Sequence, residues 1–203
     1  MKTRIIGVVG AFDENGVYGI GLNLPWGSSD GRSLLKLDMG RFVEVTRRTA
    51  PEGKRNVLVI GRGTAEAMGM SPLPGRHMIV ISNTLNEAEI NKDRPKEKQL
   101  AVVKNTTEAI ERALKYEDCG NIFFGGGYDV WLQALKSGVC THAFTTIVMC
   151  DTAKMSSHQG AIRKAPEMSV HETFAGMFVE SVDVSDMWGQ QEVPLRFHNY
   201  HRR

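Results

Sequence analysis

Short apolar runs alternate with segments of helical spacing along most of this chain of 203 residues. The apolar runs have the length and residue types of strands, and the helical segments lie between them. Strands are predicted at 5–11, 56–60, 77–82, 101–103, 121–124 and 143–150, and helices at 34–49, 64–68, 106–116 and 129–136. This alternation predicts an α/β fold with a mostly parallel, twisted sheet of about eight strands and flanking helices on both faces.

The last part of the chain has a different pattern. Residues 178–184 and 195–200 alternate between apolar and polar positions around a loop at Gly189, which predicts an antiparallel hairpin at the edge of the sheet. The polar segment 86–99 is expected at the surface, whereas 151–169 shows no clear pattern. With no internal repeat and no composition break, 1–203 is predicted to form a single domain.

Asp38 lies in the middle of an otherwise apolar helix face. By the spacing of three and four residues, that face comprises Leu35, Asp38, Phe42, Val45, Thr46 and Thr49. A buried carboxylate needs a partner, because an unpaired charge is costly to bury. One interpretation places Asp38 at the rim, paired with a surface Lys or Arg. The other makes it a pocket carboxylate that binds a cationic or amidine-like heterocycle and takes part in proton transfer.

The segment from Val17 to Trp26, before this helix, is rich in glycine and ends in Pro-Trp. Glycines give a loop alternative backbone conformations, and the proline and tryptophan would anchor its far end. It is either a long connection with a packed tryptophan or a mobile lid over a pocket.

Three further turns have residues suited to anions. Gly61-Arg62-Gly63-Thr64 joins a strand to a helix, where free N–H groups and the Arg62 guanidinium favour an anion, although any tight turn would also use Gly-Arg-Gly. Arg76 follows a rigid Pro-Leu-Pro-Gly turn and either faces a carboxylate or is solvated. Gly125-Gly126-Gly127 also joins a strand to a helix, and three glycines exceed the needs of a turn, which favours a ligand close to the backbone.

The charge, the cysteines and the lengths of the apolar runs exclude several classes of protein. The formal net charge of +2 argues against a general nucleic-acid binder. Three widely spaced cysteines show no metal-ligand grouping, so we expect free thiols and no metal. The N-terminus is typical of a strand rather than a signal peptide, and no apolar run reaches the length of a membrane span. We therefore expect a cytoplasmic protein without a membrane partner.

Taken together, six blocks resemble the dihydrofolate reductase family in their order and spacing. They are VYGIGLNLPW, LDMGRFVEVT, NVLVIGRGT, PLPGR with HMIVISN, FFGGGYDVW and LRFHNYHR, and they extend from about Gly7 to the last residues. The resemblance implies an NADPH-dependent reduction of 7,8-dihydrofolate to tetrahydrofolate, with hydride transfer to C6 and protonation at N5. It also implies the family's α/β fold.

On the substrate side, the resemblance implies a role for each matching residue. Asp38 matches the acid that hydrogen-bonds the pteridine amino group and ring nitrogen, Thr146 the threonine bound to that acid, and Trp26 the residue that holds a water near it. Arg76 matches the residue that pairs with the glutamate α-carboxylate. The remaining substrate contacts are expected from Val9, Phe42, which packs on the pteridine and benzoyl rings, and Leu73, which lines the benzoyl pocket.

On the cofactor side, the resemblance places Arg62, Ser82 and Asn83 at the adenosine 2′-phosphate and Thr64 at the pyrophosphate. Ala11 and Tyr18 would border the nicotinamide. The remaining expected NADPH contacts are Gly61, Gly63, Gly125, Gly126, Gly127, Tyr128, Asp129 and Val130. Gly126-Gly127 is preferred over Gly125-Gly126 as the family's cis glycine pair, because Val130 and Trp131 then match the family's Val-Tyr.

The sequence departs from the family pattern in four places. Extra residues around 27–33 separate Trp26 from Asp38, which makes Asp30 a competing acid; we prefer Asp38 because Phe42 and Thr46 follow at helical spacing. Ala65 stands where the family has tryptophan, and Gly125 where a branched apolar residue is usual. The segment 151–166 lacks the family's Gly-Asp-Thr-x-Phe-Pro pattern and is not assigned.

Two rival functions remain at this point. A reductase of riboflavin precursors would share the cofactor side but would need neither the Asp38 helix nor an arginine for a glutamate tail. A structural or binding protein could keep the fold without turnover. Under the preferred interpretation, the chain is a monomer whose partners are NADPH and a small-molecule substrate, with no nucleic acid.

Overall fold

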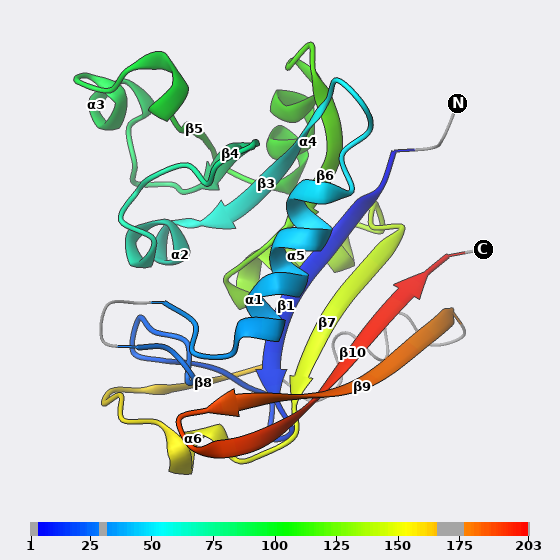
Figure 1. Ribbon diagram of the computed structural model, residues 1–203. Coiled ribbons are helices and arrows are strands. Elements are labelled where there is room, and N and C mark those ends of the chain that lie inside the picture. The colour runs from blue at the N-terminus through cyan, green and yellow to red at the C-terminus, as the bar shows by residue number, and fades with distance from the viewer. Residues whose placement is uncertain (1–3, 29–31, 166–176, 203) are drawn as a thin grey trace. The chain divides into compact units, whose positions relative to one another are not determined.

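The computed structural model describes residues 4–28, 32–165 and 177–202, which contain a main sheet of eight strands (Figure 1). The strand order is β5-β4-β3-β6-β1-β7-β10-β9. The strands are β1 (Ile6–Asp13), β3 (Arg55–Gly61), β4 (Arg76–Ile81), β5 (Ala101–Val103), β6 (Cys119–Phe124), β7 (His142–Val148), β9 (Phe178–Trp188) and β10 (Gln191–His201). Neighbours from β5 to β1 pair in parallel, whereas β10 pairs antiparallel with β7 and β9. The predicted sheet and its C-terminal hairpin are confirmed.

Short helices connect these strands. They are α1 (Lys36–Val43), the π-helix η1 (Glu44–Arg48), α2 (Arg62–Ala67), α3 (Glu87–Asn91), the 3₁₀-helix η2 (Lys96–Lys98), α4 (Thr106–Leu114), α5 (Tyr128–Lys136) and α6 (Thr152–Met155). Some begin at side-chain caps that the sequence supplies. The Asn105 side chain accepts from the backbone N–H of Glu108 at 2.9 Å, which satisfies one of the unpaired donors at the start of α4.

The described residues fall into two compact units. The first comprises those within Met1–Val8 and Glu44–Cys140, and the second those within Val9–Val43 and Thr141–Arg203. Strand β1 begins in the first unit and continues into the second. That 1–203 forms a single domain stays a prediction.

The first unit is built on consecutive apolar residues in parallel strands. Val57, Leu58, Val59 and Ile60 of β3 are all buried, as are Ile122, Phe123 and Phe124 of β6. Strands with such continuous apolar runs are covered on both faces, and α4 and α5 pack on this part of the sheet. The loops at the carboxyl ends of these strands are therefore held on a rigid base.

The second unit has its own apolar core. Trp26 and Leu35 pack there with Val148 of β7 and with Val193 and Leu195 of β10. The residues on either side of the segment 27–34 are thus fixed by the C-terminal strands. Asp30, the competing acid, lies outside the described residues.

The helix predicted over 34–49 changes type midway. It is an α-helix over Lys36–Val43 and then widens into the π-helix Glu44–Arg48. Leu35, Asp38, Val45 and Thr46 are buried as expected, but Thr49 is exposed, so its placement on the buried face is wrong. A π-turn has more residues than an α-turn, which shifts the later positions off the α-helical face.

The expected loop Val17–Trp26 contains a strand that the sequence pattern did not reveal. Strand β2 (Val17–Ile20) pairs antiparallel with β8 (Ile162–Lys164), which lies in the segment left unassigned. Gly19 makes room for this pairing, since a Cβ there would lie 2.8 Å from Arg163 Nε. The first half of the proposed lid is therefore part of a small second sheet.

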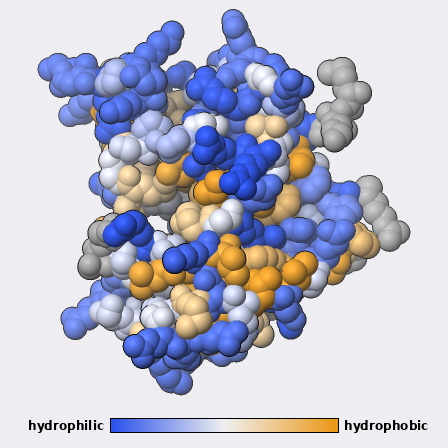
Figure 2. All heavy atoms as spheres, viewed as in Figure 1, coloured by the Kyte–Doolittle hydropathy of each residue, from blue (hydrophilic) through white to orange (hydrophobic). Residues whose placement is uncertain are grey.

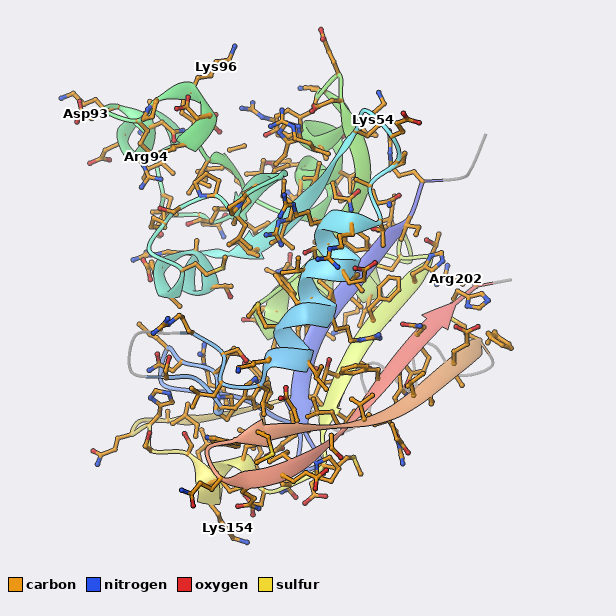
Figure 3. The ribbon with its side chains drawn as sticks, viewed as in Figure 1. Lys54, Asp93, Arg94, Lys96, Lys154 and Arg202 are labelled. Atoms are coloured by element: carbon orange, nitrogen blue, oxygen red, sulfur yellow. The ribbon has the colours of Figure 1, made fainter. Side chains whose placement is uncertain are left out.

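The polar segment 86–99 lies at the surface, as predicted, although it contains α3 and η2. Asp93 and Lys96 project from it into solvent (Figure 3). No helix in the described parts of the chain is both long enough and apolar enough to cross a bilayer.

Candidate active site

The second unit brings together the three predicted catalytic residues. Asp38 on α1 is only 7% exposed, and Trp26 Nε1 donates a hydrogen bond to its Oδ2 at 3.3 Å. The side chain of Thr146 on β7 also hydrogen-bonds the Asp38 carboxyl. The alternative of a rim carboxylate is therefore wrong, and Asp38 is a buried acid with two neutral donors.

Burial gives this carboxyl an unusual acidity. Desolvation raises the pKa of Asp38 from 3.8 to about 6, because a charged group is less stable away from water. Hydrogen bonds from Thr146 and Trp26 and the nearby charge of Arg41 oppose the rise, and the charge of Asp186 adds to it. The group is thus mostly ionised at neutral pH but close to its titration midpoint, as suits a group involved in proton transfer.

The other residues expected near the pteridine and nicotinamide lie on elements of the same unit. Val9 and Ala11 are on β1, where Val9 is buried and Ala11 is half-buried. Phe42 follows Asp38 by one turn of α1 and is half-buried. Tyr18 lies on β2, and the guanidinium carbon of Arg163 is 5.6 Å from the centre of its ring. No pattern in the sequence indicated this contact of Arg163.

In the first unit, Arg76 is a buried cation rather than a solvated one. It is 8% exposed, and its Nη1 donates to Thr46 Oγ1 at 2.7 Å. Burial and the nearby charge of Arg47 lower the pKa of Arg76 to about 10, so it stays charged at neutral pH. Leu73, in the preceding turn, is half-buried. A desolvated guanidinium is suited to an anionic partner such as a carboxylate.

The glycine turns of the first unit lie against each other. The backbone N–H of Gly61 donates to the carbonyl of Gly126 at 2.6 Å, and the peptide bond Gly126-Gly127 is cis, in the preferred register. A Cβ on Gly126 would lie 3.3 Å from Thr64 Oγ1, and one on Gly61 would lie 3.2 Å from Val130 Cγ2.

The start of α5, next to this turn, has polar groups available to a ligand. Its N-cap is Gly127, which has no side chain to cap the helix, and Tyr128 and Asp129 form its first turn. Gly63 and Gly125 are half-buried on either side of the glycine contact. Glycine backbone next to the positive end of a helix dipole fits the phosphates of a dinucleotide.

Arg62, also in the first unit, is oriented by two side chains that the sequence reasoning missed. Its Nε donates to Glu66 Oε1 at 2.6 Å, and its Nη1 donates to Thr84 Oγ1 at 2.7 Å. Thr84 Oγ1 also lies 3.4 Å from Ser82 Oγ. Thr84 therefore contacts both Arg62 and Ser82, two of the residues predicted to bind the 2′-phosphate. Asn83 is exposed beside them. A guanidinium with neighbouring hydroxyls fits a phosphate monoester.

Residues 4–28, 32–165 and 177–202 contain no group of three or more His, Cys, Asp or Glu side chains that could hold a metal ion. The three cysteines are free thiols.

Comparisons with known proteins identify the family. The family model described as dihydrofolate reductase matches residues 5–156. The dihydrofolate reductase of Drosophila melanogaster is 31% identical over 143 residues, which cover 66% of this chain and 71% of the relative. That of Saccharomyces cerevisiae is 28% identical over 134 residues, covering 65% and 60%.

A solved structure extends the likeness beyond the matched segment. The dihydrofolate reductase from Enterococcus faecalis, complexed with NADP(H) and RAB-propyl, has a TM-score of 0.64 and 25% sequence identity, and the match covers 98% of this chain and 96% of that one. The fold, the buried acid with its two donors and the match over 5–156 lead to one assignment: the chain belongs to the dihydrofolate reductase family.

Proposed function

We propose that Asp38 binds the pteridine ring of the substrate through its amino group and ring nitrogen, with Trp26 and Thr146 holding the carboxylate in place. The chain is an NADPH-dependent oxidoreductase that reduces 7,8-dihydrofolate to tetrahydrofolate. The observation that carries the proposed role is the buried Asp38 carboxyl, which has a raised pKa and two neutral hydrogen-bond donors.

The protein's part in the reaction is orientation and proton supply. NADPH, when bound, supplies the hydride that reaches C6 of the substrate. Asp38 holds the far edge of the ring and cannot reach N5 directly, so a water molecule carries the proton there. The ionised carboxylate stabilises positive charge on the ring system and thereby favours that protonation. The segment Gly16–Trp26 excludes bulk water from the reacting atoms.

In the first unit, Arg76 binds the α-carboxylate of the glutamate tail and Leu73 contacts the benzoyl ring. Arg62, with Ser82, Asn83 and Thr84, binds the 2′-phosphate of NADPH. The glycine turns and Thr64 hold the pyrophosphate. These roles rest on the buried charge of Arg76 and on the cluster of donors around Arg62.

A spectrophotometric assay tests the activity. NADPH is mixed with dihydrofolate and, separately, with a riboflavin precursor, and the loss of NADPH absorbance is followed. Turnover with dihydrofolate alone is expected. Turnover with the riboflavin precursor alone would support the rival reductase, and no turnover with either would indicate a binding protein.

Replacing Arg62 by alanine should weaken NADPH binding and leave NADH nearly unchanged. A hydrogen bond to a charged group contributes about 1.5–3 kcal/mol, so the Kd for NADPH should rise roughly 10- to 150-fold. NADH has no 2′-phosphate and loses nothing. Fluorescence titration of both cofactors measures this, with the exposed Arg48→Ala as control. Equal losses for the two cofactors would show that Arg62 is structural.

We also propose that the enzyme is a cytoplasmic monomer with no nucleic-acid partner. The small net charge of +2 supports the absence of a nucleic-acid partner, because strong phosphate binding requires a basic surface. Light scattering should give the mass of one chain, and a mass of two chains would refute the monomer. Retention of the purified protein on DNA at physiological salt would refute the absence of a nucleic-acid partner, and cell fractionation tests the location.

A further inference from the structure

Arg41 lies one turn after Asp38 on α1 and is anchored to the C-terminal strand. Its Nη2 donates to the carbonyl oxygen of His198 at 2.9 Å and to Asn199 Oδ1 at 2.7 Å. Its guanidinium carbon lies 4.5 Å from the centre of the Phe197 ring. Three consecutive residues of β10 therefore hold the Arg41 guanidinium through two hydrogen bonds and a cation–π contact. A solvated surface arginine does not require so many contacts.

Asp186 of β9 holds the start of the same helix. It is 8% exposed, and its Oδ2 accepts a hydrogen bond from the backbone N–H of Leu37 at 2.5 Å. Its Oδ1 accepts from the N–H of Met187 at 2.8 Å. A helix leaves its first N–H groups unpaired, and here a carboxylate from a distant strand satisfies one of them. Exposed apolar side chains, including Leu37 and Met187, gather over this part of the second unit (Figure 2).

The strand register connects these anchors with the partner of Asp38. Phe197 of β10 lies directly opposite Thr146 of β7. The strand that receives Arg41 is thus paired with the strand that carries Thr146, so one stretch of the ladder fixes both the helix and the hydroxyl at the carboxyl.

Arg41 and Asp186 also carry the charges that act on Asp38. Among the described residues, the positive charge of Arg41 on α1 favours the ionised form of the carboxyl, and the negative charge of Asp186 on β9 opposes it. The contacts from Trp26 and from Thr146 on β7 are neutral. Conversely, the Asp38 carboxylate favours the charged form of Arg41, whose pKa is lowered by burial.

We propose that Arg41 and Asp186 are positioning residues for Asp38: they fix helix α1 to the C-terminal hairpin and set, with opposite signs, the electric field at its carboxyl. This inference rests on the proposed function of Asp38. Arg41 attracts the negative charge on Asp38 and Asp186 repels it, so the pair adjusts the ionisation that burial and the two hydrogen bonds establish near neutral pH.

The titration of the Asp38 carboxyl, followed by carbon-13 NMR in the folded protein without ligands, tests the pair directly. R41Q keeps hydrogen-bond donors for β10 but removes the charge, and the pKa of Asp38 should rise. D186N keeps an acceptor for the Leu37 N–H, and the pKa of Asp38 should fall. R48Q is the matched control, because Arg48 is exposed and pairs with Glu44; it should change nothing.

The pH profile of hydride transfer gives the second measurement. The part of the rate that depends on ionised Asp38 should shift to higher pH in R41Q and to lower pH in D186N, while R41K, which keeps the charge, stays near the parent. A folded R41Q or D186N with an unchanged Asp38 titration overturns the proposal. If R41Q does not fold, the D186N titration decides. Shifted titrations with pH-independent hydride transfer would instead contradict the proposed role of Asp38 and leave this inference intact.

Discussion

Hydride transfer in Asp38→Asn should be slower than in the parent by roughly 100- to 10,000-fold near neutral pH, the range for loss of a group that assists proton transfer. The substitution is nearly isosteric and still offers an oxygen to Trp26 and Thr146. It removes the negative charge that favours protonation at N5. Pre-steady-state measurement of hydride transfer separates this step from product release.

The loss should shrink as the pH falls below about 6. There the parent carboxyl is itself protonated, since its pKa is raised to about 6, and solvent can protonate the substrate in both proteins. The exposed Asp183→Asn is the matched control, and Asp30→Asn tests the competing acid; both should behave like the parent. A near-normal Asp38→Asn or an inactive Asp30→Asn would overturn the assignment.

The stability of the same variant checks the burial argument. A carboxyl whose folded pKa lies above its unfolded value stabilises the fold at low pH, and this contribution is lost as the pH rises through about 6. Asp38→Asn should therefore be more stable than the parent at pH 8, by on the order of 1–3 kcal/mol, and should lose that advantage at pH 4. Urea unfolding at the two pH values measures the difference.

The second large effect is expected at Arg76. Removing one partner of a buried, hydrogen-bonded charge pair costs about 2–5 kcal/mol, so Arg76→Leu should raise the KM for dihydrofolate by roughly 30- to 5,000-fold. The effect should be on KM rather than kcat, because the glutamate tail is remote from the reacting atoms. Steady-state kinetics with dihydrofolate measure the two constants.

A small pterin without a glutamate tail is the control substrate for Arg76→Leu. It makes no use of the guanidinium, so its KM should stay near the parent value. Equal losses for the two substrates would mean that the bond from Arg76 to Thr46 maintains the fold rather than binding the tail.

Local patterns predicted the elements with strong hydrophobic periodicity. Strand β5 matches its predicted bounds, and β3, β6, α4 and α5 lie within two residues of theirs. The strands β2 and β8 were missed because they are short and are stabilised by pairing with each other across more than a hundred residues. That pairing depends on Gly19 leaving space for Arg163, which no local pattern encodes.

The residues of the candidate site also differ in whether a local sequence pattern could reveal them. Asp38 could be found because a carboxylate interrupts an apolar helix face, and its neighbours were placed through the family resemblance. Arg41, Asp186 and Thr84 were not found, because each acts through residues distant in sequence; the bond between Asp186 and Leu37, for example, spans 149 positions. Contacts of this kind exist only once the sheet has formed.

The attachment of α1 to β10 has a consequence for a chain that is still being synthesised. The residues that hold Arg41 are Phe197, His198 and Asn199, near the end of β10. A nascent polypeptide that stops at Gly189 would already contain Asp38, Trp26 and Thr146, yet α1 would lack its attachment to the final strand. Partly made or prematurely terminated chains that lack β10 should therefore bind substrate poorly and show little catalysis.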